Sequence, residues 1–445
     1  MDFLFFYEHE NREFESLLLI KRILQWRGYC VGISHVSARG YGWHTLFSAP
    51  KVVIVPWFRY DDNVYKYTRF LRKKVNKIVN LQMEQIYSNY GVDTGLVTTQ
   101  GLAKEGYHLC WGEHSKERML SRGIQDSHTH ICGAVQLDFF HPAFAGYFKS
   151  RLELAGEYNL DESKQWRMFI SSFAYATYTK ETLQHLKDNF GDYSEFAHVS
   201  RISREKILNW YEKVLPVRKD VLFIYRPHPS ETADERLLGI ERRFGNFKVI
   251  SNYSIRHWIV ACNVIDTWYS TSIAEVYFAK KNCHILRPEP IPNKYEVEIM
   301  ANAQFINTYS DFIKTFDNNA LSEKPFPIPE EHLKLYYEQC NECLSAERIC
   351  DYLEKVLHND SYSADYYLGL IGNKKKYYRV VITSLLGDII YHLGVRLSRI
   401  IPIRKDILRN LEDKNIGRRK KLQEMEKTLS PYIDNYLNTK NIISK

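Results

Sequence analysis

Short apolar runs alternate with segments of helical periodicity along most of this chain, and this alternation restricts the fold more than any other feature. The first series has expected strands at residues 3–7, 29–34, 52–56, 77–81, 108–111 and 129–132. The helix expected over residues 13–27 carries apolar side chains at helical spacing and ends at Gly28. Strands that alternate with helices pair in parallel, so this series predicts a parallel sheet with helices on both faces.

A second series of the same kind follows a connector at residues 145–165. Its expected strands lie at residues 167–171, 221–225, 248–250, 264–267 and 283–286. A chain of 445 residues is too long for one ordinary core. We therefore predict an α/β fold of two doubly wound, Rossmann-like domains, residues 1–150 and 165–330, with a C-terminal helical appendage over residues 331–445. Two such domains that face each other across a cleft form the GT-B architecture.

The strand expected over residues 221–225 is followed by Arg226-Pro227-His228-Pro229. Each proline keeps the residue before it extended, which fixes His228 at a strand end. Ligands of doubly wound sheets bind there, and a histidine can bind or protonate a departing phosphate because its pKa is near neutrality. Arg226 either adds a bidentate phosphate contact or pairs with an acid. The alternative is a structural role, in which the His228 ring only forms hydrogen bonds with the backbone.

Small hydroxyl side chains follow two other strands of the second series. One group, directly before an apolar helix, consists of Ser270, Thr271 and Ser272. These residues are N-cap candidates, and the free N–H groups of a helix start bind phosphate. Glu275 stands three residues after Ser272, so it either completes a capping box or accepts hydrogen bonds from ribose hydroxyls. Ser171 and Ser172 follow the first strand of this series and either contact the same phosphate or form a plain turn.

The first domain carries acids after several of its expected strands. In enzymes that transfer a sugar, a carboxylate either takes the proton of the acceptor hydroxyl or attacks the sugar itself. Our first choice is Glu84, in the segment 80–85 after the fourth expected strand, and Glu8 after the first strand is a further candidate. The other acids near strand ends are Glu10, Glu13, Glu113 and Asp138.

Positive charge gathers near the C-terminus, although the whole chain carries only +8. The basic residues of this segment are Lys374, Lys375, Lys376, Arg379, Arg396, Arg399, Arg404 and Lys405, with Asp388 as the one acid. Apolar residues between them fall mostly on one helical face, which predicts a basic amphipathic helix on an anionic membrane surface. The alternative is a helix packed on its own protein. A localised charge of this kind argues against nucleic acid as a partner.

Other features indicate the compartment. The eight cysteines are scattered, as is typical of reduced thiols in a cytoplasmic protein. Cys340, Cys343 and Cys350 lack a fourth ligand nearby, and no Asp-x-Asp motif follows the strands, so we expect no metal. No signal peptide and no run of eighteen apolar residues is present. We expect a cytoplasmic protein that is peripheral at the inner face of the cell membrane.

Several segments, in order, resemble bacterial surface-carbohydrate biosynthesis proteins, the capsule and O-antigen glycosyltransferases of GT-B type. The matching segments are 8–28, 79–84, 111–112, 131–138, 170–173, 225–229 and 270–275. The pairing of His228-Pro229 with the downstream hydroxyl group also resembles sialyltransferases, polysialyltransferases and β-Kdo transferases, which use CMP-activated sugars. This resemblance implies that His228 meets the cytidine phosphate together with Ser270, Thr271 and Ser272. The family's acidic run after the fourth strand is reduced here to Glu84.

These observations predict a glycosyltransferase that moves a sugar from a nucleotide donor to a glycan or glycolipid acceptor. The resemblance favours a cytidine-activated over a uridine-activated donor. The donor acts as co-substrate, and no cofactor is expected. One alternative is a CDP-glycerol-type polyol-phosphate transferase, or a nucleotide-sugar epimerase on the same fold. A second alternative is a non-catalytic scaffold that binds a membrane or nucleic acid.

Overall fold

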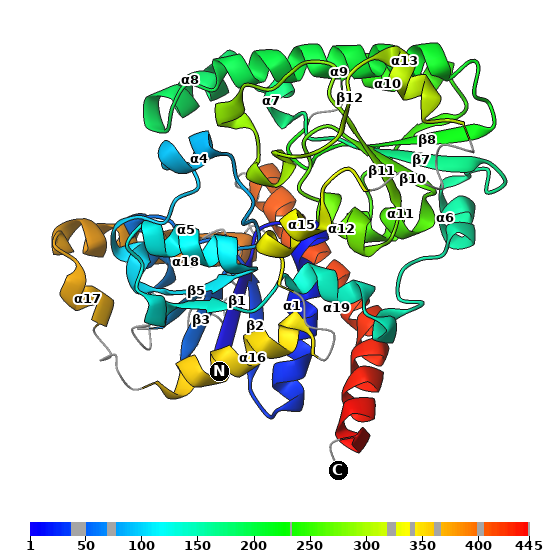
Figure 1. Ribbon diagram of the computed structural model, residues 1–445. Coiled ribbons are helices and arrows are strands. Elements are labelled where there is room, and N and C mark those ends of the chain that lie inside the picture. Colours follow the sequence, from blue (N-terminus) through cyan, green and yellow to red (C-terminus); the bar gives the residue numbers. More distant parts are fainter. Residues whose placement is uncertain are drawn as a thin grey trace. The chain divides into compact units, whose positions relative to one another are not determined.

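The computed structural model describes residues 1–36, 50–68, 77–231, 234–317, 326–338, 343–359, 366–397 and 405–443 (Figure 1). The chain forms two compact units. Unit 1 comprises Met1–Gln85, Thr99–Tyr147 and Leu335–Lys445, and unit 2 comprises Ile86–Thr98 and Phe148–Lys334. The predicted domain ranges differ from these units, since residues 86–98 belong to unit 2 and the helical appendage belongs to unit 1 from Leu335 onward.

Unit 1 is built on a six-stranded parallel sheet of order β2-β1-β3-β4-β5-β6. Its strands are β1 (Phe3–Tyr7), β2 (Val31–His35), β3 (Val52–Val55), β4 (Ile78–Asn80), β5 (Tyr107–Cys110) and β6 (Thr129–Ile131). The central strands β1, β3, β4 and β5 are buried along their whole length. Continuous apolar runs are typical of parallel strands that are covered on both faces.

Helices cover this sheet. They include α1 (Glu10–Trp26), α3 (Asp61–Tyr67), α5 (Glu113–Ser121), α16 (Ser345–His358), α17 (Tyr366–Leu370), α18 (Lys374–Leu397) and α19 (Lys405–Ile443). Apolar side chains of α1 such as Phe14, Leu17 and Ile20 are buried. On its polar side, α1 is joined to α19 by ion pairs, Lys21 with Glu426 at 2.7 Å and Arg22 with Asp434 at 2.8 Å. The C-terminal helix is therefore an integral part of unit 1.

Unit 2 is built on a second six-stranded parallel sheet, of order β12-β11-β10-β7-β8-β9. Its strands are β7 (Gln165–Ile170), β8 (Val221–Arg226), β9 (Phe247–Val249), β10 (Val264–Thr267), β11 (Asn282–Leu286) and β12 (Phe305–Ile306). Helices of this unit include α6 (Arg151–Tyr158), α8 (Lys180–Asn189), α9 (Ser194–Val214), α10 (Glu235–Arg243), α11 (Ile255–Ala261), α12 (Ile273–Phe278) and α13 (Tyr309–Lys314). The chain adds β8 and β9 on one side of β7 and then crosses to add β10, β11 and β12 on the other. The strand order therefore reverses between β7 and β10, as in the Rossmann fold.

A buried ion pair joins the two central strands of unit 2. The guanidinium of Arg167 on β7 donates to both carboxylate oxygens of Asp266 on β10, at 2.6 and 2.8 Å. His284 Nδ1 lies 3.2 Å from the same carboxylate, and Tyr211 donates to it at 3.3 Å. Burial alone would raise the pKa of Asp266, but the charges and hydrogen bonds of Arg167 and His284 together lower it below the ordinary value.

The predicted α/β class is confirmed, with two parallel sheets, helices around each and a C-terminal helix. β12 was not predicted, because two residues carry no readable periodicity. Among the described residues, no helix is both long enough and apolar enough to cross a membrane.

Candidate functional site

Three strands of unit 2 end side by side, and each is followed by one of the predicted motifs. Ile170, the last residue of β7, is paired with Arg226 of β8 on one side and with Thr267 of β10 on the other. The segments that begin at Ser171, Pro227 and Trp268 therefore leave the same edge of the sheet. Neighbouring strands are about 4.8 Å apart, so β8 and β10 lie about 10 Å apart at this edge. The strand order reverses here, which is where doubly wound sheets bind ligands.

His228 stands exposed at this edge, in the turn after β8. Its Nδ1 accepts a hydrogen bond from the backbone N–H of Ser230 at 3.1 Å. A neutral ring with an accepting Nδ1 carries its proton on Nε2. His228 is thus set in the tautomer whose Nε2–H can donate to a phosphate oxygen.

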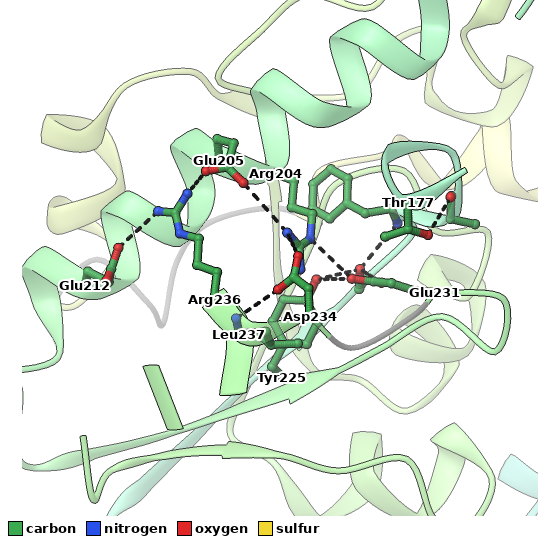
Figure 2. Close-up of polar contacts among 12 residues, drawn as sticks. Thr177, Arg204, Glu205, Glu212, Tyr225, Glu231, Asp234, Arg236 and Leu237 are labelled. Carbon is green, nitrogen blue, oxygen red and sulfur yellow. Dashed lines mark hydrogen bonds and ion pairs between the residues drawn. The ribbon is translucent and has the colours of Figure 1, made fainter. Parts of the chain in front are cut away.

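Glu231 holds this turn from the protein interior (Figure 2). Its side chain is fully buried and accepts hydrogen bonds from the hydroxyl of Tyr225 at 2.7 Å and from the backbone N–H of His228 at 3.3 Å. The hydroxyl of Ser171 donates to the same carboxylate. Arg204 on α9 lies 3.5 Å away and also pairs with Asp234, which caps α10 through the N–H of Leu237. Sequence reasoning missed Glu231, although an acid three residues after His228 was a visible signal.

The two serines after β7 differ in what their hydroxyls contact. Ser171 is committed inside the protein, because its Oγ binds Glu231 and accepts hydrogen bonds from Tyr225 at 2.9 Å and from the N–H of Phe173 at 3.3 Å. The Ser172 hydroxyl is buried and has no hydrogen-bond partner among the residues that the structure describes. Of the pair, Ser172 is the one whose oxygen remains for a ligand.

The hydroxyl residues after β10 form a turn of their own. Ser270 Oγ accepts the N–H of Ser272 at 3.2 Å, and the N–H of Ser270 donates to Thr267 Oγ1 at 3.3 Å. All three side chains of the group, including Thr271, are half-buried. Ser272 is the N-cap of α12, but its side chain makes no capping hydrogen bond.

Glu275 is held by a residue from another helix. Its Oε1 lies 3.4 Å from Nη1 of Arg256, a buried arginine on α11. Ser272 and Glu275 therefore do not form the capping box that was the structural alternative. The Glu275 carboxylate pairs instead with Arg256, which is distant in sequence. The predicted ribose contact of Glu275 stays a prediction.

Arg226 is buried and faces the loop after β9 rather than an acid. Its guanidinium donates to the carbonyls of Ile250 at 3.4 Å, Asn252 at 2.5 Å and Tyr253. Burial lowers the pKa of Arg226 to about 10, which still leaves it charged at neutral pH. In this geometry Arg226 holds the loop after β9. The geometry does not favour the bidentate phosphate contact that was one of the two expectations for Arg226.

In unit 1 the two candidate acids, Glu8 and Glu84, both interact electrostatically with Arg12. Glu8 follows β1, and its Oε2 accepts the indole N–H of Trp57 at 3.0 Å. Arg12 donates to the buried Glu13 at 2.8 Å, and Glu13 also accepts the backbone N–H of Glu8. Burial alone would lower the pKa of Arg12. The charges of Glu13, Glu84 and Glu8, together with the hydrogen bond to Glu13, outweigh burial, so the pKa is raised.

Two of the other acids near strand ends, Asp138 and Glu10, have structural partners. Asp138 is buried and accepts the first N–H groups of α16, those of Ser345 and Ala346, both at 2.8 Å. Burial raises the pKa of Asp138 to about 7. Glu10 pairs with Arg418 of α19 at 2.9 Å. Within the described ranges, no three His, Cys, Asp or Glu side chains gather as metal ligands. Cys340 lies outside those ranges.

No protein-family model and no curated protein matches this sequence. Solved structures with a similar fold do exist. A variant of the wall teichoic acid polymerase TagF has a TM-score of 0.52 and 12% identity, over 81% of this chain and 90% of that chain. TagF with CDPG gives 0.50 and 14%, over 80% and 88%. S. aureus MnaA with UDP gives 0.50 and 12%, over 83% and 97%. The chain therefore has the GT-B-like fold of these proteins.

Proposed function

We propose that the chain is a glycosyltransferase that moves a CMP-activated sugar, such as Kdo or a sialic-acid-like sugar, to a growing capsule or lipopolysaccharide glycan. One observation carries the proposal. The polar segments after β7, β8 and β10 leave one edge of the unit 2 sheet, at the reversal of strand order. That edge is the usual nucleotide site of doubly wound sheets.

In the proposed reaction the donor phosphate lies against this edge. The Nε2–H of His228 donates to a phosphate oxygen and stabilises the charge that develops as the bond between the sugar and the phosphate breaks. The hydroxyls of Ser172, Ser270, Thr271 and Ser272 contact the same group, and Glu275 contacts the ribose. Ser171 and Arg226, expected to bind the donor directly, act in this scheme through the loops they hold. With the charge carried by these groups, the scheme requires no metal.

Unit 1 supplies the carboxylate. Glu84 or Glu8 takes the proton of the acceptor hydroxyl as its oxygen attacks the anomeric carbon, or attacks that carbon itself. The products are the extended glycan and CMP. Both acids interact electrostatically with Arg12, Glu84 more strongly than Glu8. An acceptor built on a lipid places this reaction at the inner face of the cell membrane.

Transfer of a polyol phosphate from a CDP-linked donor, or epimerisation of a nucleotide sugar, is the second candidate. It is favoured by the similar folds of TagF with CDPG and of MnaA with UDP. The phosphate-binding role of His228 is the same in each case. The candidates differ in the bond that breaks and in the need for an acceptor.

Chromatography of the nucleotide products separates these reactions. The purified chain is incubated with CMP-Kdo, CMP-sialic acid, CDP-glycerol or UDP-GlcNAc, with and without a capsule or lipopolysaccharide glycan. The proposal predicts acceptor-dependent release of CMP from a CMP-sugar and none by His228→Ala. Release of CMP from CDP-glycerol, or isomerisation of UDP-GlcNAc without a glycan, would establish the second candidate instead.

A further inference from the structure

Helix α18 carries large apolar side chains on two faces, and one of these faces is part of the unit 1 core. Tyr377 is buried in that core. Val380, Val381 and Leu385 pack against the same cluster of apolar side chains. Because this face already anchors the helix to its own protein, the other face needs a separate explanation.

The second face is exposed. Its members, here called the outer face, are Tyr378 (47% exposed), Ile382 (54%), Leu386 (51%), Ile390 (66%) and Leu393 (48%). Their spacing of four, four, four and three residues keeps them along one line of an α-helix. Single exposed apolar residues are ordinary, but a contiguous row of five indicates an interaction surface.

Two cations continue this line at its N-terminal end. Lys375 and Arg379 precede Ile382 by seven and three residues, so they lie on the same side of the helix. Both are exposed, and neither makes an ion pair with any residue that the structure describes. Lys376, on a different side of the helix, is paired with Asp62 at 3.1 Å. The outer face therefore presents unneutralised positive charge followed by apolar surface.

We propose that the outer face of α18 binds an anionic membrane surface. The helix lies in the plane of the interface, with Ile382, Leu386 and Ile390 in the boundary between headgroups and acyl chains. Lys375 and Arg379 contact lipid phosphates. A second copy of this chain fits less well, because the described residues of the outer face include no carboxylate to pair with these cations. The inference extends the proposed function by giving the route to a lipid-linked acceptor.

Flotation of the full-length chain with vesicles tests the inference without donor or acceptor. The vesicles are phosphatidylcholine alone, or phosphatidylcholine mixed with phosphatidylglycerol. We expect the protein to float with the anionic vesicles and to be released by salt. The double variant Ile382→Glu/Leu386→Glu should lower the partition coefficient by at least about tenfold, since it places two carboxylates in the apolar boundary. Lys375→Gln/Arg379→Gln should lower it roughly fivefold per charge, and only with anionic vesicles.

The matched control carries the same chemical changes on unit 2. Leu152 and Val217 are 66% and 74% exposed, so Leu152→Glu/Val217→Glu should float like the natural protein. Thermal unfolding of every variant shows that the fold is intact. Absence of flotation with both vesicle types, or equal flotation of Ile382→Glu/Leu386→Glu, would overturn the inference. A dimer in light scattering that this variant abolishes would also overturn it and would assign the outer face to self-association. None of these results bears on donor chemistry, which the nucleotide assay tests.

Discussion

Glu231 and His228 are joined by two hydrogen bonds of opposite direction. The backbone N–H of His228 donates to the Glu231 carboxylate at 3.3 Å, and the backbone N–H of Glu231 donates to the His228 carbonyl at 2.8 Å. The exposed ring thus stands on a turn that is fixed by a buried charge. Because the same carboxylate binds Tyr225 and Ser171, one side chain connects the ends of β7 and β8.

Glu231→Gln should therefore lower both stability and turnover. The amide keeps the volume but removes a buried charge that faces Arg204, and breaking such a pair costs about 3–5 kcal/mol. We expect a lower melting temperature and a lower kcat for transfer. Glu235→Gln, at an exposed partner of Arg242 in the same unit, is the matched control and should change neither. Equal melting temperatures of the two variants would contradict this role of Glu231.

His228→Ala should remove transfer activity and leave the fold intact. The ring is exposed, so its loss creates no cavity. Loss of a group that stabilises the leaving phosphate typically lowers turnover about 10²- to 10⁴-fold. His185→Ala, an exposed histidine on α8, provides the control. Natural turnover in His228→Ala, measured by product chromatography, would exclude this ring from the reaction.

Glu84→Gln should reduce turnover far more than donor affinity. A glutamine cannot accept the acceptor proton, but it leaves the unit 2 phosphate contacts unchanged. The parallel variant Glu8→Gln identifies which of the two acids is the base or nucleophile. Glu117→Gln, at an exposed position of α5, is the control. If both Glu84→Gln and Glu8→Gln retain natural kcat values, another acid carries the reaction.

The sequence predicted the two parallel sheets because their strands are continuous apolar runs that alternate with helices. It also placed His228, Ser172 and the 270–272 segment at strand ends, and pairing of β7 with β8 and β10 then brings these ends to one edge. The partners of charged side chains could not be predicted in this way. Arg226 meets carbonyls of residues 250–253, and Glu275 meets Arg256, through folding of remote segments.

The C-terminal segment shows the same limit. Spacing of apolar residues indicated a helix over much of residues 373–405, and α18 forms there. The unit 1 core determines which side of this helix is buried. Val381 and Leu385 pack against that core. Periodicity alone could not separate that face from the exposed row that includes Ile382 and Leu386.

Asp266→Asn should destabilise unit 2 and alter its acid unfolding. The folded-state pKa of Asp266 is lower than its ordinary value of 3.8, since Arg167 and His284 together outweigh burial. The unfolded state therefore binds the proton more tightly, and the stabilisation is present above about pH 4 and lost as the pH falls through the folded-state pKa. Thermal unfolding between acidic and neutral pH should show a lower melting temperature and a shallower acid slope in Asp266→Asn.

A control for this change is Asp220→Asn, whose side chain is 61% exposed and pairs with Arg218. It should behave almost as the natural chain does, because an exposed ion pair contributes little. An Asp266→Asn protein with the same melting temperature as Asp220→Asn at neutral pH would show that the Arg167 pair does not stabilise the sheet.

Calorimetric titration of CMP into the natural chain and into His228→Ala tests most directly whether the unit 2 edge holds a nucleotide phosphate. We expect saturable binding of CMP by the natural chain, weaker or absent binding of ADP and GDP, and at least about tenfold weaker CMP binding by His228→Ala, because a charged hydrogen bond is lost. Binding of no nucleotide at all, or equal CMP affinity in the two proteins, would contradict a nucleotide-phosphate site at the unit 2 edge.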